Sequence, residues 1–437
     1  MTVRTLAPAV YDKVTTAVAR DTGERRTAAL WIHAAGLARH AREHGRLPAG
    51  AQSPGPDGLR KSLEALASCH PALAPLTDPQ VLPVWDQPLG DAAWEILDDF
   101  WARHPVLEAE HRVDGYALGD AYQLLSEDAR KGRALCQTPP WIARLLLRLS
   151  LEPAMEEWGP ADVRMIDPAC GTGHIAVAAF HMARVPPARG RRRSPAGDGH
   201  QAVERALATV AGVDLDPYAA ALTAYRLLAS CASILRIPLD HVPGSWPVNV
   251  AAADSLLDGD EPLLRAGAYH ACVANPPYIT PRDAGVRDRV RAAYPQVAVG
   301  KYSLALPFTA LMLERLAAPG GYVAQLTANA FMKREFGRRY VTEFLPRFDA
   351  RWIIDTSGAY IPGHGTPTCI LVHRARPPVG DTVTVIRGNR GEPRVPEDPA
   401  RGLVWSAIED AVDSRLARDR FQEGLERFQR GEVTSSE

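Results

Sequence analysis

Residues 275–278 read Asn-Pro-Pro-Tyr and follow an apolar run, 269–274, that is typical of a buried strand. Ligands bind at the carboxyl ends of strands in open α/β sheets. The two prolines donate no hydrogen bond and stiffen the loop. The side-chain oxygen of Asn275 and the carbonyl oxygen of Pro276 are two acceptors suited to a planar –NH2 group, and Tyr278 offers a ring to stack on it. The pattern predicts a site that holds such an amine, with an ordinary proline-rich turn as the alternative.

A glycine-rich turn (residues 167–173) lies upstream, between an expected strand over 163–166 and an expected helix over 175–184. Gly171 and Gly173 would let a ligand approach the backbone closely. The free N–H groups at the start of the helix suit a carboxylate or a phosphate. Many nucleotide-binding folds use such a turn, so by itself it indicates only a fold class.

Acidic side chains follow the next two expected strands. Asp214 follows the strand 210–213 and is placed to accept hydrogen bonds from ribose hydroxyls. Asp254 follows a strand expected over 248–252, where a carboxylate could meet an adenine amino group. These side chains would line one ligand site, because the ends of parallel strands share an edge of the sheet.

The elements that must position these residues form three parts. Residues 1–133 show helical periodicity and predict a helical accessory domain, which either clamps DNA or only packs. Residues 134–378 alternate strands and helices, as a doubly wound α/β sheet requires, and form the expected catalytic domain. After one more strand over 382–386, the pattern is weak, so 379–437 is expected to be a polar tail. The arginine-rich stretch 186–199 is expected to be a surface loop, with a phosphate contact as the less favoured alternative.

Composition agrees with a globular protein, with 46% hydrophobic and 23% charged residues and a formal net charge of −1. No run of about 18 apolar residues and no signal pattern is evident, so no membrane association is expected. The six cysteines show no C-x-x-C spacing, which favours free thiols in the cytoplasm and no metal site. Cys170 and Cys272, inside the motifs, are expected to be packing residues.

The motifs together resemble a known family. DPACGTG, GVDLDP, ADSL and NPPY, in this order, are similar to motifs of class I S-adenosylmethionine-dependent methyltransferases that modify exocyclic amines. DPACGTGH followed by NPPYI resembles the DNA N6-adenine methyltransferases in particular. Residues 137–140 resemble the cofactor-contacting TPP motif of that group. Residues 355–368 closely resemble a segment of the adenine methyltransferases of phage-growth-limitation and bacteriophage-exclusion defence systems.

The resemblance implies a Rossmann-like methyltransferase that uses S-adenosylmethionine and flips an adenine out of double-stranded DNA. Other phage-defence proteins are implied as further partners. The catalytic residues it implies are Asn275, Pro276 and Tyr278. The cofactor-binding residues are Thr138, Pro139, Asp167, Ala169, Gly171, Gly173, Asp214 and Asp254. Basic residues that could contact phosphates, although a solvated helix face is expected for any single one, are Arg282, Arg287, Arg289, Arg291, Lys301, Lys333, Arg334, Arg338 and Arg339.

One departure concerns DNA sequence recognition. Related defence methyltransferases carry a large carboxyl-terminal region that is expected to read DNA, whereas this sequence stops at Glu437. We therefore expect the chain alone to methylate DNA weakly or not at all, and to need a partner for site choice. Two alternatives stay open: a methyltransferase that acts on a protein glutamine amide, and a chain that binds cofactor or DNA without turnover.

Overall fold

The computed structural model describes residues 6–48, 55–106, 114–125, 137–185, 199–362, 365–388 and 390–429. Of the arginine-rich stretch expected to be a loop, only Gly199 lies within the described residues, where it begins a helix. Every cysteine in the described ranges is buried and free, including Cys170 and Cys272.

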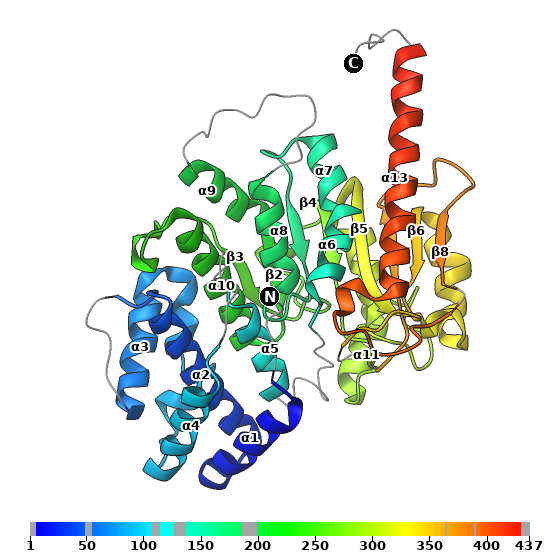
Figure 1. Ribbon diagram of the computed structural model, residues 1–437. Helices are drawn as coiled ribbons and strands as arrows, with labels where there is room; N and C mark the ends of the chain where they lie inside the picture. Colours follow the sequence, from blue (N-terminus) through cyan, green and yellow to red (C-terminus); the bar gives the residue numbers. More distant parts are fainter. Residues whose placement is uncertain are drawn as a thin grey trace.

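The centre of the molecule is an eight-stranded sheet with the order β3-β2-β1-β4-β5-β7-β6-β8 (Figure 1). The strands are β1 (Met165–Asp167), β2 (Val210–Asp214), β3 (Asn249–Ala252), β4 (Tyr269–Ala274), β5 (Ala317–Ala328), β6 (Asp349–Asp355), β7 (Thr368–Arg374) and β8 (Thr384–Arg387). β1 to β5 pair in parallel, whereas β7 runs antiparallel to both β5 and β6. β8 pairs in parallel with β6.

Helices cover both faces of the sheet, so the predicted doubly wound fold is confirmed. They are α6 (Pro140–Arg148), α7 (Leu151–Trp158), α8 (His174–Arg184), α9 (Gly199–Thr209), α10 (Pro217–Leu235), α11 (Ala284–Ala293) and α12 (Ala305–Ala310). Strand side chains alternate between two cores. Val273 of β4 joins the core that contains α6 to α10, while its neighbours Cys272 and Ala274 join the core that contains α11 and α12.

The expected helical domain consists of α1 (Pro8–Thr22), α2 (Arg25–Glu43), α3 (Gly55–Cys69), α4 (Asp91–Arg103) and α5 (Tyr116–Leu125). It packs on α10 and shares one continuous core with it (Figure 1). His33 Nδ1 lies 2.7 Å from the Tyr218 hydroxyl, and His40 Nδ1 lies 2.8 Å from the Tyr225 hydroxyl. The two histidines are seven residues apart on α2, as the two tyrosines are on α10, so the helices lie side by side over about two turns.

α10 is apolar almost throughout. Among the described helices, it alone is long and apolar enough to cross a membrane. This is a weak indication, because 83% of its apolar 18-residue stretch is buried inside the protein. Its one charged residue, Arg226, is also buried.

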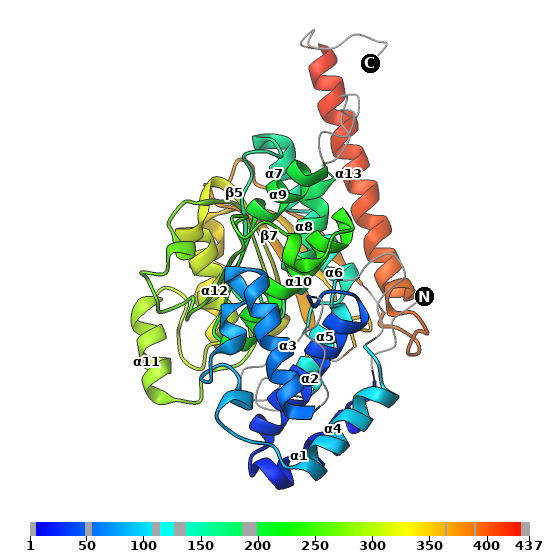
Figure 2. The same ribbon diagram turned by 90° about the vertical axis from the view of Figure 1, so that its left-hand side faces the viewer.

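The polar tail expected over 379–437 contains regular secondary structure in its described residues. The strand predicted near 382–386 is present as β8, which lies in the same sheet, and α13 (Leu403–Gln429) follows it. The first half of α13 buries Trp405, Ile408 and Val412, while the second half projects away from the body (Figures 1 and 2). The three buried positions mark one narrow face over only two turns, which is why the helical pattern was too weak to predict.

Candidate active site

Four of the expected functional side chains lie where parallel strands end. Asp167 and Asp214 are the last residues of β1 and β2, and Asn275 directly follows β4. Asp254 lies two residues beyond the end of β3. Because β1 to β4 are parallel, these ends meet at one edge of the sheet.

A cavity of about 350 Å³ opens at this edge, within the size range of small-molecule sites. The expected residues that line it are Thr138, Asp167, Ala169, Gly171, Asp214, Asp254 and Asn275. Those that do not line it are Pro139, Gly173, Pro276 and Tyr278. Much of the apolar wall comes from Ile279, Val286, Val290, Leu304 and Phe308. The cavity also has Asp216 and Asp283 in its wall, so it combines five aspartates with an apolar surface.

The glycine-rich turn is held from behind by α10. Gly171 and Gly173 have φ of 52° and 88°, in the left-handed region that favours glycine. The Thr223 hydroxyl donates to the Gly171 carbonyl oxygen at 2.9 Å. A β-carbon at Gly173 would lie 2.9 Å from the Thr223 side chain, so the turn also needs glycine for space. Gly173 thus shapes the turn without touching the cavity.

Asp214 holds the turn from the side of β2. One carboxylate oxygen accepts from the Gly171 N–H at 2.8 Å, and the other accepts from the Asp216 N–H at 2.9 Å. A carboxylate has about four lone-pair sites, so both oxygens can still accept from a ligand. Asp214 therefore has a structural task that the sequence analysis did not foresee, in addition to its place in the cavity wall.

Asp167 is the most deeply buried carboxyl group of the cavity, with 1% of its surface exposed. Burial raises the pKa of Asp167 to about 8, although one oxygen accepts from the Ala169 N–H at 3.0 Å. The nearby Asp214 charge acts in the same direction. The Asp167 carboxyl group is therefore mostly protonated at neutral pH, and a cation in the cavity would favour its ionised form.

Asn275 has both ends of its side-chain amide engaged. The Nδ2 group donates to the Thr138 hydroxyl at 3.1 Å, and Oδ1 accepts from the Tyr278 hydroxyl. Thr138 is buried and lies 137 residues earlier in the chain. Both partners are hydroxyl groups, and in the structure the amide nitrogen faces Thr138 while Oδ1 faces Tyr278.

A second cavity of about 100 Å³ lies on the other side of the same loop. It is lined by Tyr278, Thr280, Lys301, Ser303, Leu306, Ala328, Ala330, Phe331, Arg334 and Phe336. Asn275 and Pro277 face the first cavity, whereas Tyr278 faces the second, so the Asn-Pro-Pro-Tyr loop separates the two. Phe331, which is buried, supplies an aromatic wall of the second cavity.

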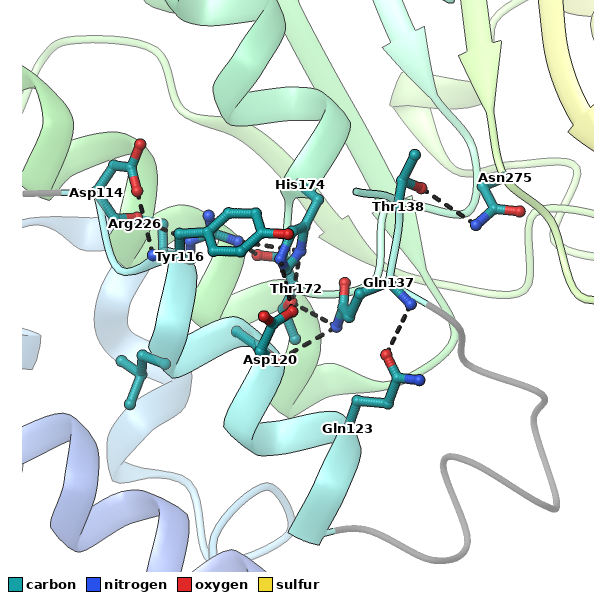
Figure 3. A network of polar contacts seen from close by, with 12 residues as sticks. Asp114, Tyr116, Asp120, Gln123, Gln137, Thr138, Thr172, His174, Arg226 and Asn275 are labelled. Carbon is teal, nitrogen blue, oxygen red and sulfur yellow. Dashed lines mark hydrogen bonds and ion pairs between the residues drawn. The ribbon is translucent and has the colours of Figure 1, made fainter. Parts of the chain in front are cut away.

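A buried polar network beneath the first cavity was missed by the sequence analysis (Figure 3). Arg226 is 1% exposed and donates to the carbonyl oxygens of Asp114, at 2.8 Å, and Thr172, at 2.6 Å. His174 Nε2 lies 3.3 Å from a carboxylate oxygen of Asp120. One signal could have revealed it: a single arginine inside an apolar helix is almost never fully buried without partners.

Comparison with known proteins confirms the family resemblance. Residues 208–361 match the family described as Eco57I restriction-modification methylase. Over 339 residues, the chain is 40% identical to the adenine-specific methyltransferase PglX of Streptomyces coelicolor, in an alignment that covers 68% of this chain and 28% of that protein. The chain thus spans less than a third of the length of this relative.

Solved structures confirm the methyltransferase fold. The type I restriction-modification system methyltransferase subunit from Streptococcus thermophilus superposes with a TM-score of 0.50 at 14% identity, covering 94% of this chain and 93% of that one. The type IIL restriction-modification enzyme MmeI, in complex with DNA, superposes with a TM-score of 0.56 at 12% identity, covering 89% and 60%. At such identities the likeness concerns the fold alone.

Proposed function

Taking the Eco57I methylase match over 208–361 and the 40% identity to PglX as premises, we propose that this chain methylates N6 of adenine in double-stranded DNA. The methyl donor is S-adenosylmethionine, and the setting is a restriction-modification or phage-defence system in the cytoplasm. The observation that carries the proposal is the position of Asn275. It lies in the wall of the larger cavity and is hydrogen-bonded to Tyr278, which lines the second cavity.

The chemistry of the larger cavity fits S-adenosylmethionine. The aspartates in its wall, among them the expected Asp167, Asp214 and Asp254, suit a ligand that carries an ammonium group, a sulfonium group and ribose hydroxyls. We assign the methionine moiety to Thr138 and Asp167, the ribose to Asp214 and the adenine amino group to Asp254. Burial raises the pKa of Asp254 as well, so its carboxyl group is also held in a weakly solvated place.

Methyl transfer needs the target amine to be held as its geometry changes. The N6 lone pair is conjugated into the adenine ring, so the amine is a poor nucleophile. Asn275 Oδ1 would accept from one N–H bond of this amine, and the Pro276 carbonyl oxygen, which lines neither cavity, is the second acceptor that we expect. Together they would favour the tetrahedral nitrogen that forms as it attacks the methyl group. The new N–C bond forms as the sulfonium C–S bond breaks, and the nitrogen then releases a proton to solvent.

Thr138 and Tyr278 would support Asn275 in this step. The Thr138 hydroxyl would hold the amide nitrogen while Oδ1 faces the Tyr278 hydroxyl, and Tyr278 lines the second cavity, where a flipped base would enter. When the target amine arrives, the Tyr278 hydroxyl would release Oδ1, which would then accept from the amine. The Tyr278 ring would stack on the base. Lys301 and Arg334 line the second cavity and could contact the flanking phosphates. By contrast, Arg291, Arg338 and Arg339 form ion pairs on their own helices.

The proposal is tested by offering radiolabelled S-adenosylmethionine to duplex DNA and, separately, to protein substrates. We expect label in DNA, recovered as N6-methyladenine by mass spectrometry. Label in a glutamine side chain would favour the protein methyltransferase instead. Cofactor binding without transfer, in the presence of the other proteins of a defence system, would favour a chain that only binds.

Asp214→Ala should weaken S-adenosylmethionine binding by about 1–3 kcal/mol, because it removes an acceptor for the ligand and releases the Gly171 N–H. Isothermal titration calorimetry measures this directly. Asp260→Ala is a matched control, since Asp260 is exposed and lies outside the cavity. Equal affinity in Asp214→Ala and the parent would remove Asp214 from the site.

Cofactor affinity should rise with pH up to about 8. A cation beside Asp167 binds the ionised carboxylate best. Below pH 8, which is about the pKa of Asp167 in the cofactor-free protein, binding must therefore release the proton of this carboxyl group. Affinity should therefore increase by up to about tenfold per pH unit below this value and level off above it. Asp167→Asn, which cannot ionise, should lose this dependence. Calorimetry between about pH 6.5 and 8.5 tests it, and the same slope in both proteins would contradict it.

A further inference from the structure

The helix α5 of the helical domain lies unusually close to the glycine-rich turn. A β-carbon at Gly119 would lie 2.7 Å from the Thr172 hydroxyl oxygen and 2.8 Å from His174 Cε1. With any other residue at this position the Thr172 and His174 side chains would have to shift, so glycine lets α5 approach the turn this closely. The helical domain therefore contacts the wall of the cofactor cavity directly, and not only the back of α10.

Gln123 of α5 is joined to the cavity through the segment formed by Gln137 and Thr138. Its side-chain oxygen accepts from the Gln137 N–H at 2.7 Å. The Gln137 side chain donates to the Thr172 hydroxyl at 2.8 Å and to the Gly119 carbonyl oxygen at 3.3 Å (Figure 3). Thr138, the next residue, accepts from Asn275. A continuous chain of bonds thus runs from α5 to the Asn-Pro-Pro-Tyr loop.

Asp120, one turn from Gln123 on α5, reaches the same cavity by a second path. Its carboxylate lies 3.3 Å from Nε2 of His174, which lines the cavity and is nearly fully buried. Tyr116, also on α5, packs edge-on against the His174 ring with centroids 4.5 Å apart. Both paths begin on one face of α5 and end on residues that line the larger cavity, namely Gln137 and His174.

We propose that α5 is a positioning element of the methyl-transfer site, in which Gln123 holds the Gln137–Thr138 segment and thereby orients Asn275. The inference rests on the proposed function and assigns the helical domain a task other than clamping DNA or merely packing. A partly buried backbone N–H that loses its acceptor seeks another partner, so loss of the Gln123 oxygen displaces this segment. The affinity for S-adenosylmethionine then falls, and the orientation of the Asn275 amide changes with it.

The test compares Gln123→Leu, which removes the acceptor, with Gln123→Glu, which retains it. Gln80→Leu is the matched control, because Gln80 is an exposed glutamine of the same domain. Calorimetry with S-adenosylmethionine should show about five- to tenfold weaker binding for Gln123→Leu, the effect of one hydrogen bond. Gln123→Glu and Gln80→Leu should bind within about twofold of the parent. Equal loss in the Leu and Glu variants, or no loss in either, would overturn the proposal.

A double-mutant cycle separates positioning from general destabilisation. Thr138→Val removes the acceptor for Asn275, so Gln123→Leu should add little further loss of affinity in that background if both act through one segment. Additive losses, together with equal falls in thermal midpoint, would mean that Gln123 is only structural.

Hydrogen exchange in the cofactor-free protein distinguishes failure of this inference from failure of the proposed function. The Gln137 amide should exchange faster in Gln123→Leu than in the parent, whatever ligand the cavity binds. Unchanged exchange would overturn the positioning role. If the Gln137 amide exchanges faster in Gln123→Leu but the parent protein does not bind S-adenosylmethionine, the proposed cofactor is refuted while the connection from α5 stands.

Discussion

Asn275→Ala should lower the rate of adenine methylation by about two orders of magnitude or more, because it deletes one of two aligned acceptors for the target amine. The interaction strengthens as the nitrogen becomes tetrahedral, so it contributes to turnover far more than to cofactor binding. S-adenosylmethionine affinity should accordingly change little. Single-turnover methylation of DNA, measured with any partner proteins that the system requires, gives the rate, and calorimetry gives the affinity.

Two further variants sharpen this prediction. Asn275→Asp keeps an oxygen acceptor but loses the Nδ2 donor to Thr138, so it should retain more activity than Asn275→Ala. Asn249→Ala is the matched control, because the Asn249 side chain donates to the Ala208 carbonyl oxygen and lies outside both cavities. Methylation at the parental rate by Asn275→Ala would show that the amine is held elsewhere.

Arg226→Met should lower the free energy of unfolding by about 3–5 kcal/mol, the usual effect of removing one partner from a buried charged network. The guanidinium group is 1% exposed and satisfies the carbonyl oxygens of Asp114 and Thr172. Methionine has a similar length but no donors, so these oxygens and the nearby carboxylates would stay buried without it. Urea denaturation of the cofactor-free protein measures the change.

The control for Arg226 lies on the same helix. Arg236, the residue that ends α10, is exposed, so Arg236→Met should change the unfolding free energy by less than about 0.5 kcal/mol. If Arg226→Met were equally mild, Arg226 would contribute to stability by packing rather than by its hydrogen bonds in the network of Figure 3. Arg226→Lys should also be destabilising, since one ammonium group cannot reach both carbonyl oxygens as the planar guanidinium does.

The sequence by itself determined the parallel strands β1 to β4 and the polar side chains at their carboxyl ends. Asp167, Asp214, Asp254 and Asn275 each follow a recognisable apolar run, and the ends of parallel strands converge whatever the loops between them do. For this reason the cavity residues could be predicted without knowing how far apart the helices lie. The turn could also be predicted from its glycines, because a left-handed φ usually requires glycine.

Residues beside the motifs were harder to assign correctly. Gly173 and Pro276 belong to the right loops but do not face the cavity, because neighbours in a turn point in different directions. Asp214 was expected to serve a ligand alone, yet its carboxylate also holds the turn. The local sequence pattern predicts which loop carries the functional residues. The path of the backbone within that loop decides which of their atoms face the cavity.

Only the tertiary structure decided what supports these residues. The bond between Asn275 and Thr138 and the contacts of Arg226 join segments more than 50 residues apart, and no local periodicity records such pairs. The same holds for the approach of α5 to the glycine-rich turn and for the antiparallel insertion of β7 between β5 and β6. Hydrophobic spacing predicts that a face is buried, but the identity of its partner depends on how all the elements pack at once.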